Sequence, residues 1–450
     1  MAFVSPGKLT FLSFSWAVVS MACSSAEPPP TYYRDIQPLV TTHCVDCHAA
    51  GGIAPFALDT YEALKAHLQP AVMAINARTM PPWGAEPGHE NYLYDISLSD
   101  AQIARFNQWA DTDAPLGDPD DARAPEALDK GGLNRVDVEL VMPESYDPDV
   151  TKPDDYRCFG IDWPETEAVY VNGFSATPGN ARSVHHIVAF LVGPEQAQVI
   201  DGFDAASDGP GYGCYGGATM DGWSPKSLAE TLSYSFLGQW APGQLGTTFP
   251  AGTGLLVKPG SKVVLQMHYN TLADGDLVDT SAVQFSHVKD AQRSYYVPWF
   301  DMTWYTNSES MRIPSGMEEV QHAFQARIDT APALGVLTDG EKFERGARIS
   351  AVFPHMHQLG QRITIRRIRR EVPTTLLNVP EWDFNWQREY HFAEATNVFP
   401  SDELQIECTW SNTEKMRGQR GVEPITPVDV GWGEGTTDEM CIAMVYLTPL

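Results

Sequence analysis

The repeat of apolar residues changes near residue 133, and this change limits the folds open to the chain. Before it, from residue 31 to about residue 118, apolar residues recur at helical spacing, as at Tyr61, Leu64, Leu68, Val72 and Ile75. After it, short apolar runs are separated by Gly, Pro, Asp and Asn, which is typical of antiparallel strands. The sequence therefore predicts a multidomain chain, with a small all-α domain followed by a larger β region.

Two local signals refine the helical part. Pro70 interrupts the periodic stretch and predicts a bend there. Ser99 and Gln102 have the spacing of a capping box and predict the start of a helix. The following stretch, 117–132, is rich in Asp, Pro, Gly and Ala. We therefore expect an α domain over 31–118 and a linker over 119–133.

The β region is too long for one antiparallel sandwich, which typically has about 100 residues. Its clearest predicted strands are His185–Val192, Lys262–Asn270, Arg362–Ile368 and Met444–Thr448. We expect two sandwich domains, over 134–290 and 291–450.

Charge and the N-terminal segment indicate where the chain works. It carries 58 acidic and 30 basic side chains, a formal charge of −28, which argues against nucleic acid or an anionic membrane as partner. Residues 1–23 have the form of an export signal, with Lys8 before an apolar stretch that ends at Cys23. Either Cys23 is lipidated, as in a bacterial lipoprotein, or cleavage falls near Ala22. We expect a periplasmic protein or an outer-membrane lipoprotein, touching the membrane only through such an anchor, in a compartment where disulfides can form.

A Cys-Val-Asp-Cys-His sequence marks the helical part. In the c-type haem attachment pattern, Cys44 and Cys47 bind the haem vinyl groups and His48 coordinates the iron. A zinc half-site and a thioredoxin-like redox pair are the rivals, but a zinc site would need a second ligand pair nearby. Met80, in a Met-Pro-Pro-Trp loop, is the predicted second axial ligand, while Met73 lies within the helical period and is predicted to be core.

Three histidine signals mark the β region. His355 and His357 lie two residues apart and would share one face of a strand, whereas the neighbours His185 and His186 would point to opposite faces. For both of the latter to bind one ion, the backbone must bend or the rings must use different nitrogens. The third signal is His268, two residues after Gln266. Imidazole combined with thioether favours copper, which zinc cannot replace in redox chemistry.

Four motifs occur in order and carry a resemblance: His185-His186, Gln266-Met-His268-Tyr, His355-Met-His357-x-Leu-Gly360 and Asp438-Glu-Met440-Cys441. Over about 134–450, they resemble the copper type II, ascorbate-dependent monooxygenases that act on peptidylglycine and dopamine. The family fold is two jelly-roll-like copper domains facing each other across an open cleft.

The resemblance implies a role for each matching residue. His185, His186 and His268 would bind an electron-transfer copper, with Tyr156 and Gln266 as neighbours. His355, His357 and Met440 would form the catalytic copper site. Spacing alone leaves three pairings for the last four cysteines. The resemblance implies the bridges Cys158–Cys214 and Cys408–Cys441.

The chain departs from the family where substrate binds. Phe353, Ile442 and Met444 stand where the peptide-hydroxylating enzyme has an Arg, an Asn and a Tyr that hold a carboxylate. We therefore expect O2 and a small neutral or hydrophobic organic molecule as substrates.

Two copper ions and one covalent haem c are the predicted cofactors. The haem would relay electrons, which ascorbate or a periplasmic redox protein would supply. The alternatives are a non-catalytic haem and copper electron-transfer or copper-binding protein, or an oxidase that forms peroxide. An arginine-rich segment, 362–370, is either a solvated strand face or a docking face for the acidic stretch 111–126.

Overall fold

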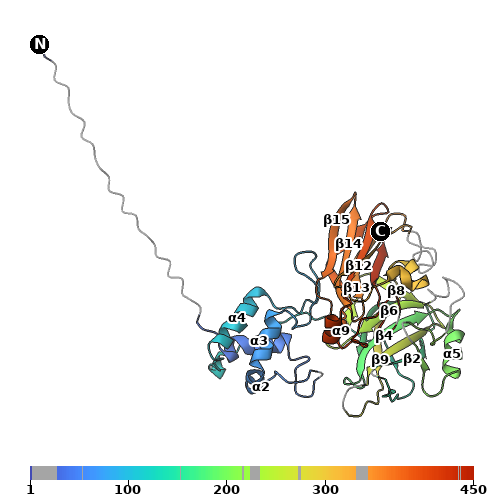
Figure 1. Cartoon of the computed structure of the whole chain (residues 1–450), viewed down its shortest axis with the longest axis horizontal. Coiled ribbons are helices and arrows are strands. Elements are labelled where there is room, and N and C mark those ends of the chain that lie inside the picture. Colours follow the sequence, from blue (N-terminus) through green and yellow to red (C-terminus); the bar gives the residue numbers. More distant parts are fainter. Residues whose placement is uncertain are drawn as a thin grey trace.

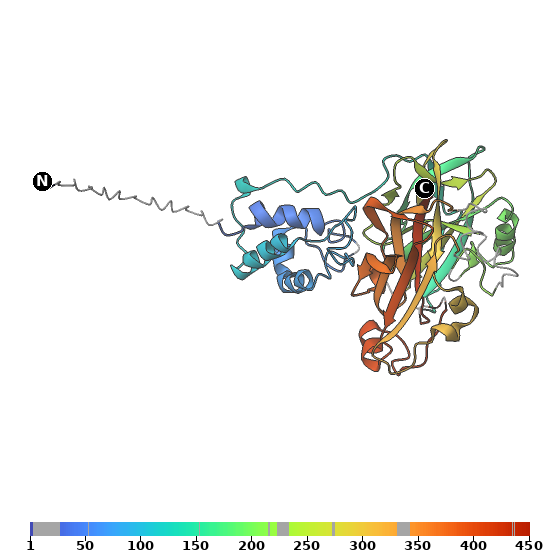
Figure 2. The same ribbon diagram turned by 90° about the horizontal axis from the view of Figure 1, so that it is seen from above.

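The computed structural model describes residues 1–2, 28–52, 54–152, 154–214, 217–222, 234–271, 275–330, 343–433, 435 and 437–450. The predicted export signal and Cys23 lie outside these residues, apart from the first two positions. Figures 1 and 2 show the helices α2 to α4 grouped beside a larger body of strands. No helix among the described residues is long and apolar enough to cross a membrane.

The helical unit packs around one apolar core. Its elements are a π-helical turn (Tyr32–Ile36), α1 (Gln37–His43), α2 (Tyr61–Ala66), α3 (Leu68–Asn76) and α4 (Asp100–Asp111). The predicted periodic positions Leu64 and Ile75 are buried in this core together with Phe106 and Trp109. The periodicity therefore marks the faces by which the helices contact one another.

The two local signals in this unit have different outcomes. Ser99 and Gln102 form both hydrogen bonds of the capping box at the start of α4, as predicted. The predicted bend at Pro70 is displaced, because α2 ends at Ala66 and α3 begins at Leu68. A proline has no N–H for the carbonyl four residues earlier, so Pro70 acts on the helix at Ala66.

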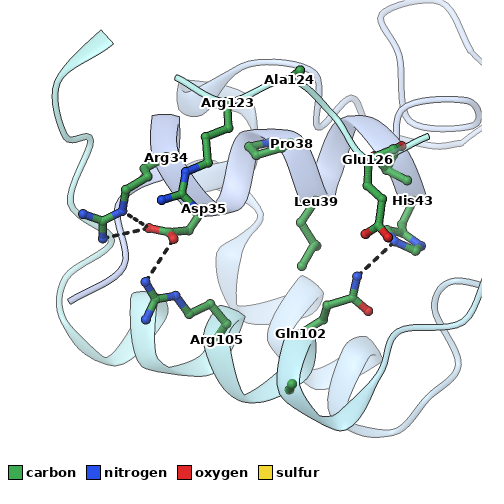
Figure 3. Close-up of a pocket in the computed structure, with 12 residues that line it drawn as sticks. Arg34, Asp35, Pro38, Leu39, His43, Gln102, Arg105, Arg123, Ala124 and Glu126 are labelled. Carbon is green, nitrogen blue, oxygen red and sulfur yellow. Dashed lines mark hydrogen bonds and ion pairs between the residues drawn. The ribbon is translucent and has the colours of Figure 1, made fainter. Parts of the chain in front are cut away.

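The segment predicted as a linker first folds back on the helical unit. It contains a short 3-10 turn (Pro119–Asp121), and the Thr42 hydroxyl donates to the Glu126 carbonyl over 3.1 Å. Figure 3 shows the cavity of about 500 Å³ that this segment encloses with α1 and α4. At one end, Arg34 and Arg105 hold the Asp35 carboxylate at 3.0 Å. Because the Asp35 carboxylate is paired with both guanidinium groups, we regard these ion pairs as structural.

The β region consists mostly of antiparallel sheets, as expected. A five-stranded sheet runs in the order β5-β2-β9-β4-β6, a four-stranded sheet in the order β12-β17-β14-β15, and a nine-stranded sheet in the order β1-β10-β3-β8-β11-β18-β13-β16 with β7 beside β3. The strands up to residue 290 are β1 (Val138–Val141), β2 (Asp154–Asp162), β3 (Val169–Thr177), β4 (Val184–Val192), β5 (Tyr212–Gly213), β6 (Tyr234–Trp240), β7 (Thr247–Thr248), β8 (Thr253–Val257), β9 (Lys262–Asn270) and β10 (Ala282–Val288). The later strands are β11 (Gln292–Trp299), β12 (Val320–Arg327), β13 (Ala347–His355), β14 (Gly360–Arg369), β15 (Val372–Val379), β16 (Tyr390–Val398), β17 (Glu403–Trp410) and β18 (Ile442–Pro449). The four predicted strands correspond to β4, β9, β14 and β18 and are confirmed.

Short helices connect the strands. They are α5 (Ala197–Ala205), α7 (Met302–Thr306), α9 (Glu414–Arg420) and the 3-10 turns Ser308–Met311 and Phe384–Trp386.

One sheet and one core join the two halves of the β region. Strands β8 and β11 pair over three residues, in the one parallel ladder among the described strands. The core between the five-stranded sheet and β1, β3, β8 and β10 also takes in Tyr296, Phe353 and Tyr446 from the second half. The halves therefore share buried apolar surface, which stabilises them together.

The helical unit is joined to the β region by its own backbone. Leu93 N–H donates to the His391 carbonyl and Ala393 N–H to the Asn91 carbonyl, both over 2.8 Å, beside the paired residues Tyr92 and Phe392. The arginine-rich segment takes no part in the contacts of the acidic stretch described above. Arg366 of β14 pairs with Glu407 of β17 at 3.1 Å, and Arg369 pairs at 2.7 Å with Asp402, which directly precedes β17. This agrees with a solvated strand face.

Candidate metal centres

The first histidine cluster lies on neighbouring strands of the five-stranded sheet. His185 and His186 are on β4, and His268 is on β9 beside them. The pairing of β4 with β9 shifts register between Val184 and His186, which is the first of the two alternatives that the sequence left open, an irregular backbone. Because of this shift, all three rings turn to one point. The Nδ1 atom of His268 lies 3.1 Å from that of His185 and 3.2 Å from that of His186, so the rings do not need different nitrogens.

A carboxylate sets the tautomer of this cluster. His268 Nε2 lies 2.8 Å from Asp154 Oδ1, so the ring donates its Nε2–H there and leaves Nδ1 unprotonated. Burial lowers the pKa of His186 and His268 well below the ordinary value, and the neighbouring histidines lower it further. Three neutral imidazoles with converging nitrogen atoms are a donor set for a transition-metal ion.

The two predicted neighbours of this cluster are in place. The Tyr156 ring stacks on the His268 ring, with centroids 4.2 Å apart and planes 9° apart. Gln266 is buried two residues before His268, and its amide donates to the Gly217 carbonyl over 3.0 Å. The disulfide Cys158–Cys214 is formed, as the resemblance implied, and lies on the strand beside Gln266.

The second cluster lies where β13 ends. The His355 and His357 ring centroids are 5.0 Å apart. His355 Nδ1 donates to Gln387 Oε1 over 2.6 Å and His357 Nδ1 to the Asp438 carbonyl over 3.1 Å, which leaves both Nε2 atoms as lone-pair donors. Burial lowers the pKa of His355 to about 4 and that of His357 to about 3, so both rings are neutral at pH 7.

Met440 joins this cluster and is held from both sides. Its neighbour Cys441 is bonded to Cys408, which confirms the second implied disulfide. Its other neighbour, Glu439, is buried and accepts hydrogen bonds from Leu359 N–H (2.6 Å), Trp410 Nε1 (2.8 Å) and His357 N–H (3.0 Å). Glu439 was within the quoted motif, but its role depends on partners far away in sequence. Gln387 and Asp154 lie outside the four motifs, and their roles likewise depend on partners far away in sequence.

The two clusters face one cavity of about 180 Å³. It is lined by His185, His186, His355, His357 and Met440, among others. The Phe384 ring stands between the clusters, 6.1 Å from the His185 ring and 5.9 Å from the His357 ring. Phe384 therefore lies between the two clusters, within the space that they share.

The haem-attachment residues line a second cavity. Cys44, Cys47, His48 and Met80 border a space of about 510 Å³. His48 Nδ1 donates to the Phe56 carbonyl over 2.9 Å. The ring proton is therefore on Nδ1, and Nε2 keeps its lone pair. Burial raises the pKa of the Cys44 thiol to about 12. Met73 is 71% exposed, so the prediction that it belongs to the core is wrong.

One ring borders both cavities. His185 lines the metal-cluster cavity and also the cavity of Cys44, Cys47 and His48. Gly243, in a loop of the β region, approaches the Cys47 sulfur so closely that a Cβ atom there would lie 3.3 Å from it. The two groups of predicted site residues are thus neighbours in space, which the sequence did not predict.

The remaining histidines have structural partners. His43 bonds the Ile96 carbonyl, His67 stacks on Phe56 and His89 pairs with Glu86. In the β region, His287 lies 3.5 Å from Glu165, His322 bonds the Arg312 carbonyl, and His391 lies 3.0 Å from Glu389. Among the described residues, His185, His186 and His268 are the one group of three or more His, Cys, Asp or Glu placed to hold a metal ion.

Known proteins resemble the β region. Residues 302–449 match the family model of the copper type II ascorbate-dependent monooxygenase, C-terminal domain. DBH-like monooxygenase protein 1 of Gallus gallus is 26% identical over 246 residues, which are 53% of this chain and 36% of that protein. Tyramine beta-hydroxylase of Caenorhabditis briggsae is 24% identical over 70% of this chain and 49% of its own length. These matches support the copper monooxygenase family for the β region, although the chain spans less than half the length of either relative.

A further relative and one solved structure complete the comparison. MOXD1 homolog 1 of Drosophila melanogaster is 23% identical over 47% of this chain and 28% of its own length. The major capsid protein P2 from Bacteriophage PM2 covers 70% of this chain and 98% of its own at 8% identity, with a TM-score of 0.23, which is too low to support an argument.

Proposed function

We propose that the chain is a copper-dependent monooxygenase that hydroxylates a C–H bond of a small neutral or hydrophobic molecule with O2. The observation that carries this proposal is a pair of separate clusters of neutral imidazoles facing one cavity. A storage protein has no need for two different donor sets around a shared space. The match of residues 302–449 to a copper monooxygenase domain supports the same conclusion.

The residues present fit two copper ions. His185, His186 and His268 would hold one ion, and His355, His357 and Met440 the other. When bound, copper supplies one-electron redox chemistry and reactivity with O2, and the Met thioether favours Cu(I). The chain's own part is to fix the donors: Asp154 orients His268, while Gln387 and the Asp438 carbonyl orient His355 and His357.

The lining of the cavity supports a neutral or hydrophobic substrate. Phe353, Ile442 and Met444, which replace the family's polar substrate-binding residues, all line the space next to the second cluster. A carboxylate placed there would lose its hydration and meet no cation, so the site rejects it.

We extend the proposal to a haem c held by Cys44, Cys47, His48 and Met80. Their shared cavity fits this group, because Lys130, Arg182 and Arg388 also line it and would face the anionic propionates. A haem there would accept and donate single electrons. His185 borders this cavity, which supports the first cluster as the acceptor, with ascorbate or a periplasmic redox protein as the outside donor.

We propose domain boundaries that separate the haem-binding residues from the two histidine clusters. A cytochrome c domain occupies 31–118, a linker 119–133, and two copper domains 134–290 and 291–450. We also propose that residues 1–23 direct export and that the mature protein is periplasmic or anchored to the outer membrane by a lipid on Cys23.

The first experiment counts copper and haem per chain in wild type and in Met440→Ile. We expect two coppers and one haem, with copper falling towards one in the variant because a ligand is lost. Met444→Ile is the matched control, since Met444 lines the same cavity but is not a proposed ligand. One copper or none in wild type would contradict the two-site enzyme.

Oxygen uptake separates the rival functions. The reduced enzyme should consume O2 only when a hydroxylatable organic compound is present. Peroxide formed in step with O2 uptake, whatever is added, would indicate an oxidase. No uptake at all would indicate a non-catalytic copper and haem protein.

Rapid mixing tests the haem relay. When haem is reduced in protein loaded with Cu(II), the haem spectrum should change to that of the oxidised form as copper is reduced. Haem that stays reduced beside Cu(II) would contradict the relay. Met80→Ile should alter the haem spectrum, whereas Met73→Ile, at an exposed position, should not.

A further inference from the structure

Three glutamine side chains line the cavity between the histidine clusters, and they differ in whether their Nε2 groups have a hydrogen-bond acceptor. The Nε2 group of Gln266 donates to the Gly217 carbonyl over 3.0 Å, and that of Gln387 to the Phe384 carbonyl over 3.1 Å. Gln239 differs. Its side chain is 8% exposed, and among the described residues its Nε2 group has no hydrogen-bond partner.

The sheet holds this unsatisfied amide in place. Gln239 lies on β6 directly opposite Val188 of β4, and both residues line the cavity. Leaving a buried N–H without an acceptor destabilises a protein, because the group loses its hydration and gains no hydrogen bond in return. Groups of this kind are rare in native structures and call for an explanation, and a ligand that supplies the acceptor is one.

The rest of the lining limits what the ligand can be. The residues that line the cavity are histidines, aromatic and aliphatic residues, methionines, Asn385 and the three glutamines. Among these described residues there is no Asp, Glu, Lys or Arg. An ammonium group would find no carboxylate and a carboxylate no cation, so a charged substrate would be desolvated without compensation.

Near Gln239 the walls are apolar. The Phe236 and Phe353 rings are stacked, with centroids 6.0 Å apart and planes 15° apart, and both form part of an aromatic surface of the cavity. Phe353 is two residues before His355, so a molecule against this surface lies beside the second cluster.

We propose that Gln239 donates a hydrogen bond from Nε2 to a neutral acceptor oxygen of the substrate. The substrate class is then an uncharged molecule with an apolar or aromatic body and one carbonyl, ether or hydroxyl oxygen. This inference rests on the proposed function only in taking this cavity as the substrate site. Gln239 is a specificity-determining residue, because it selects the oxygen atom and takes no part in the chemistry.

Acetophenone and α-methylstyrene test the proposal. The two molecules have nearly the same shape, but the carbonyl oxygen of the first is a methylene group in the second. Titration calorimetry on the full chain, copper-loaded and under argon, measures binding without turnover. We expect wild type to bind acetophenone about tenfold more tightly, as one buried hydrogen bond gives. Phenethylammonium and benzoate should bind more weakly than acetophenone.

Gln239→Met should remove the preference. Methionine has a similar length and no N–H donor, so the two probes should bind within about twofold of each other. Gln266→Met is the matched control and should keep the preference, since the Gln266 donor is already occupied. If Gln239→Met does not fold, Gln239→Asn withdraws the donor by one methylene group and should likewise lose the preference.

Equal binding of the two probes by wild type would overturn the inference, as would a preference that survives in a folded Gln239 variant. Failure of both probes to bind at millimolar concentration would overturn it too. Its failure is distinguishable from that of the proposed function. A Gln239-dependent preference without O2 uptake would refute the monooxygenase and support the inference. Substrate-dependent O2 uptake with equal binding of the two probes would support the monooxygenase and refute the inference.

Discussion

The two histidine clusters share a cavity but are built by different means. In the first cluster, β4 and β9 are neighbours inside a sheet, and a local shift in their register brings three Nδ1 atoms together. In the second, two donors come from the end of β13 and the third from a segment just before β18. That segment is held by the disulfide Cys408–Cys441 and by the buried Glu439 carboxylate. We infer that the first cluster depends on the sheet, whereas the second depends on the disulfide and hydrogen bonds that join the Met440 segment to β17 and to the residues after β13.

Breaking the cross-link should separate the clusters most clearly. In a Cys408→Ala, Cys441→Ala double variant, we expect about 3–4 kcal/mol of stability to be lost, because the unfolded chain gains freedom. The second cluster should lose its copper while the first keeps it. Urea unfolding and copper counting measure both effects.

Cys158→Ala with Cys214→Ala is the matched control for that variant. This bridge closes a longer stretch of chain, so the loss of stability should be at least as large. The first cluster should nevertheless keep its copper, because strand register sets it. If this variant empties the first cluster, the contrast between the two sites is wrong.

A second prediction concerns the tautomer of His268. Asp154→Asn should weaken copper binding at the first cluster by about 10–100-fold, because the carboxylate that holds the Nε2 proton is lost. Copper competition with a chelator, followed separately for the two sites, measures this. The Asp155→Asn variant alters the adjacent carboxylate, which accepts from Tyr146 and Asp149, and should leave copper affinity unchanged.

A third prediction concerns the ring between the clusters. Phe384→Leu keeps the site apolar but removes volume, and we expect it to reduce stability by about 1 kcal/mol. Both clusters should keep their copper, since Phe384 orients neither set of donors through its side chain. Loss of either copper would mean that the clusters are not independently built.

The smallest expected effect concerns two buried carboxylates. Burial raises the pKa of Glu439 to about 7 and outweighs the hydrogen bonds from Leu359, Trp410 and His357, which lower it. Burial alone would also raise the pKa of Asp402, but hydrogen bonds from Arg369 and the Phe399 N–H outweigh it and lower the pKa below the ordinary value.

The Asp402 pair should therefore stabilise the fold above the carboxyl group's ordinary pKa, and this contribution should be lost as pH falls through the lowered folded-state value. As pH falls, we expect the free energy of unfolding to decrease less steeply in Asp402→Asn than in wild type. Urea midpoints between pH 5 and pH 3 measure this. A steeper loss in the variant would contradict the assignment.

What the sequence predicted well depends on local spacing. Helical periodicity located Leu64 and Ile75 in a core, and of the two alternatives for the adjacent pair His185-His186 the structure has the irregular backbone. Four ordered motifs supported the family of the β region and its two disulfides.

What it missed depends on contacts between distant segments. Gln387 and Glu439 carry no local signal of their own, because their partners lie 32 and 82 residues away. Met73 fits the helical period, yet it points to solvent because the period locates a face only to within a residue or so. His185 borders the haem-motif cavity because the segment 83–94 is hydrogen-bonded to the β region. Helical periodicity carries no information about this pairing.

The position of β18 in the chain determines the order in which the two clusters can form during synthesis. This last strand lies between β11 and β13 in the middle of the large sheet and follows Met440 directly in the chain. All three proposed ligands of the first cluster have been synthesised by residue 268, but the second cluster is complete only after Met440. A chain that terminates between residues 268 and 440 would therefore contain the proposed ligands of the first cluster and lack Met440, so premature termination would leave the first proposed copper site without its partner.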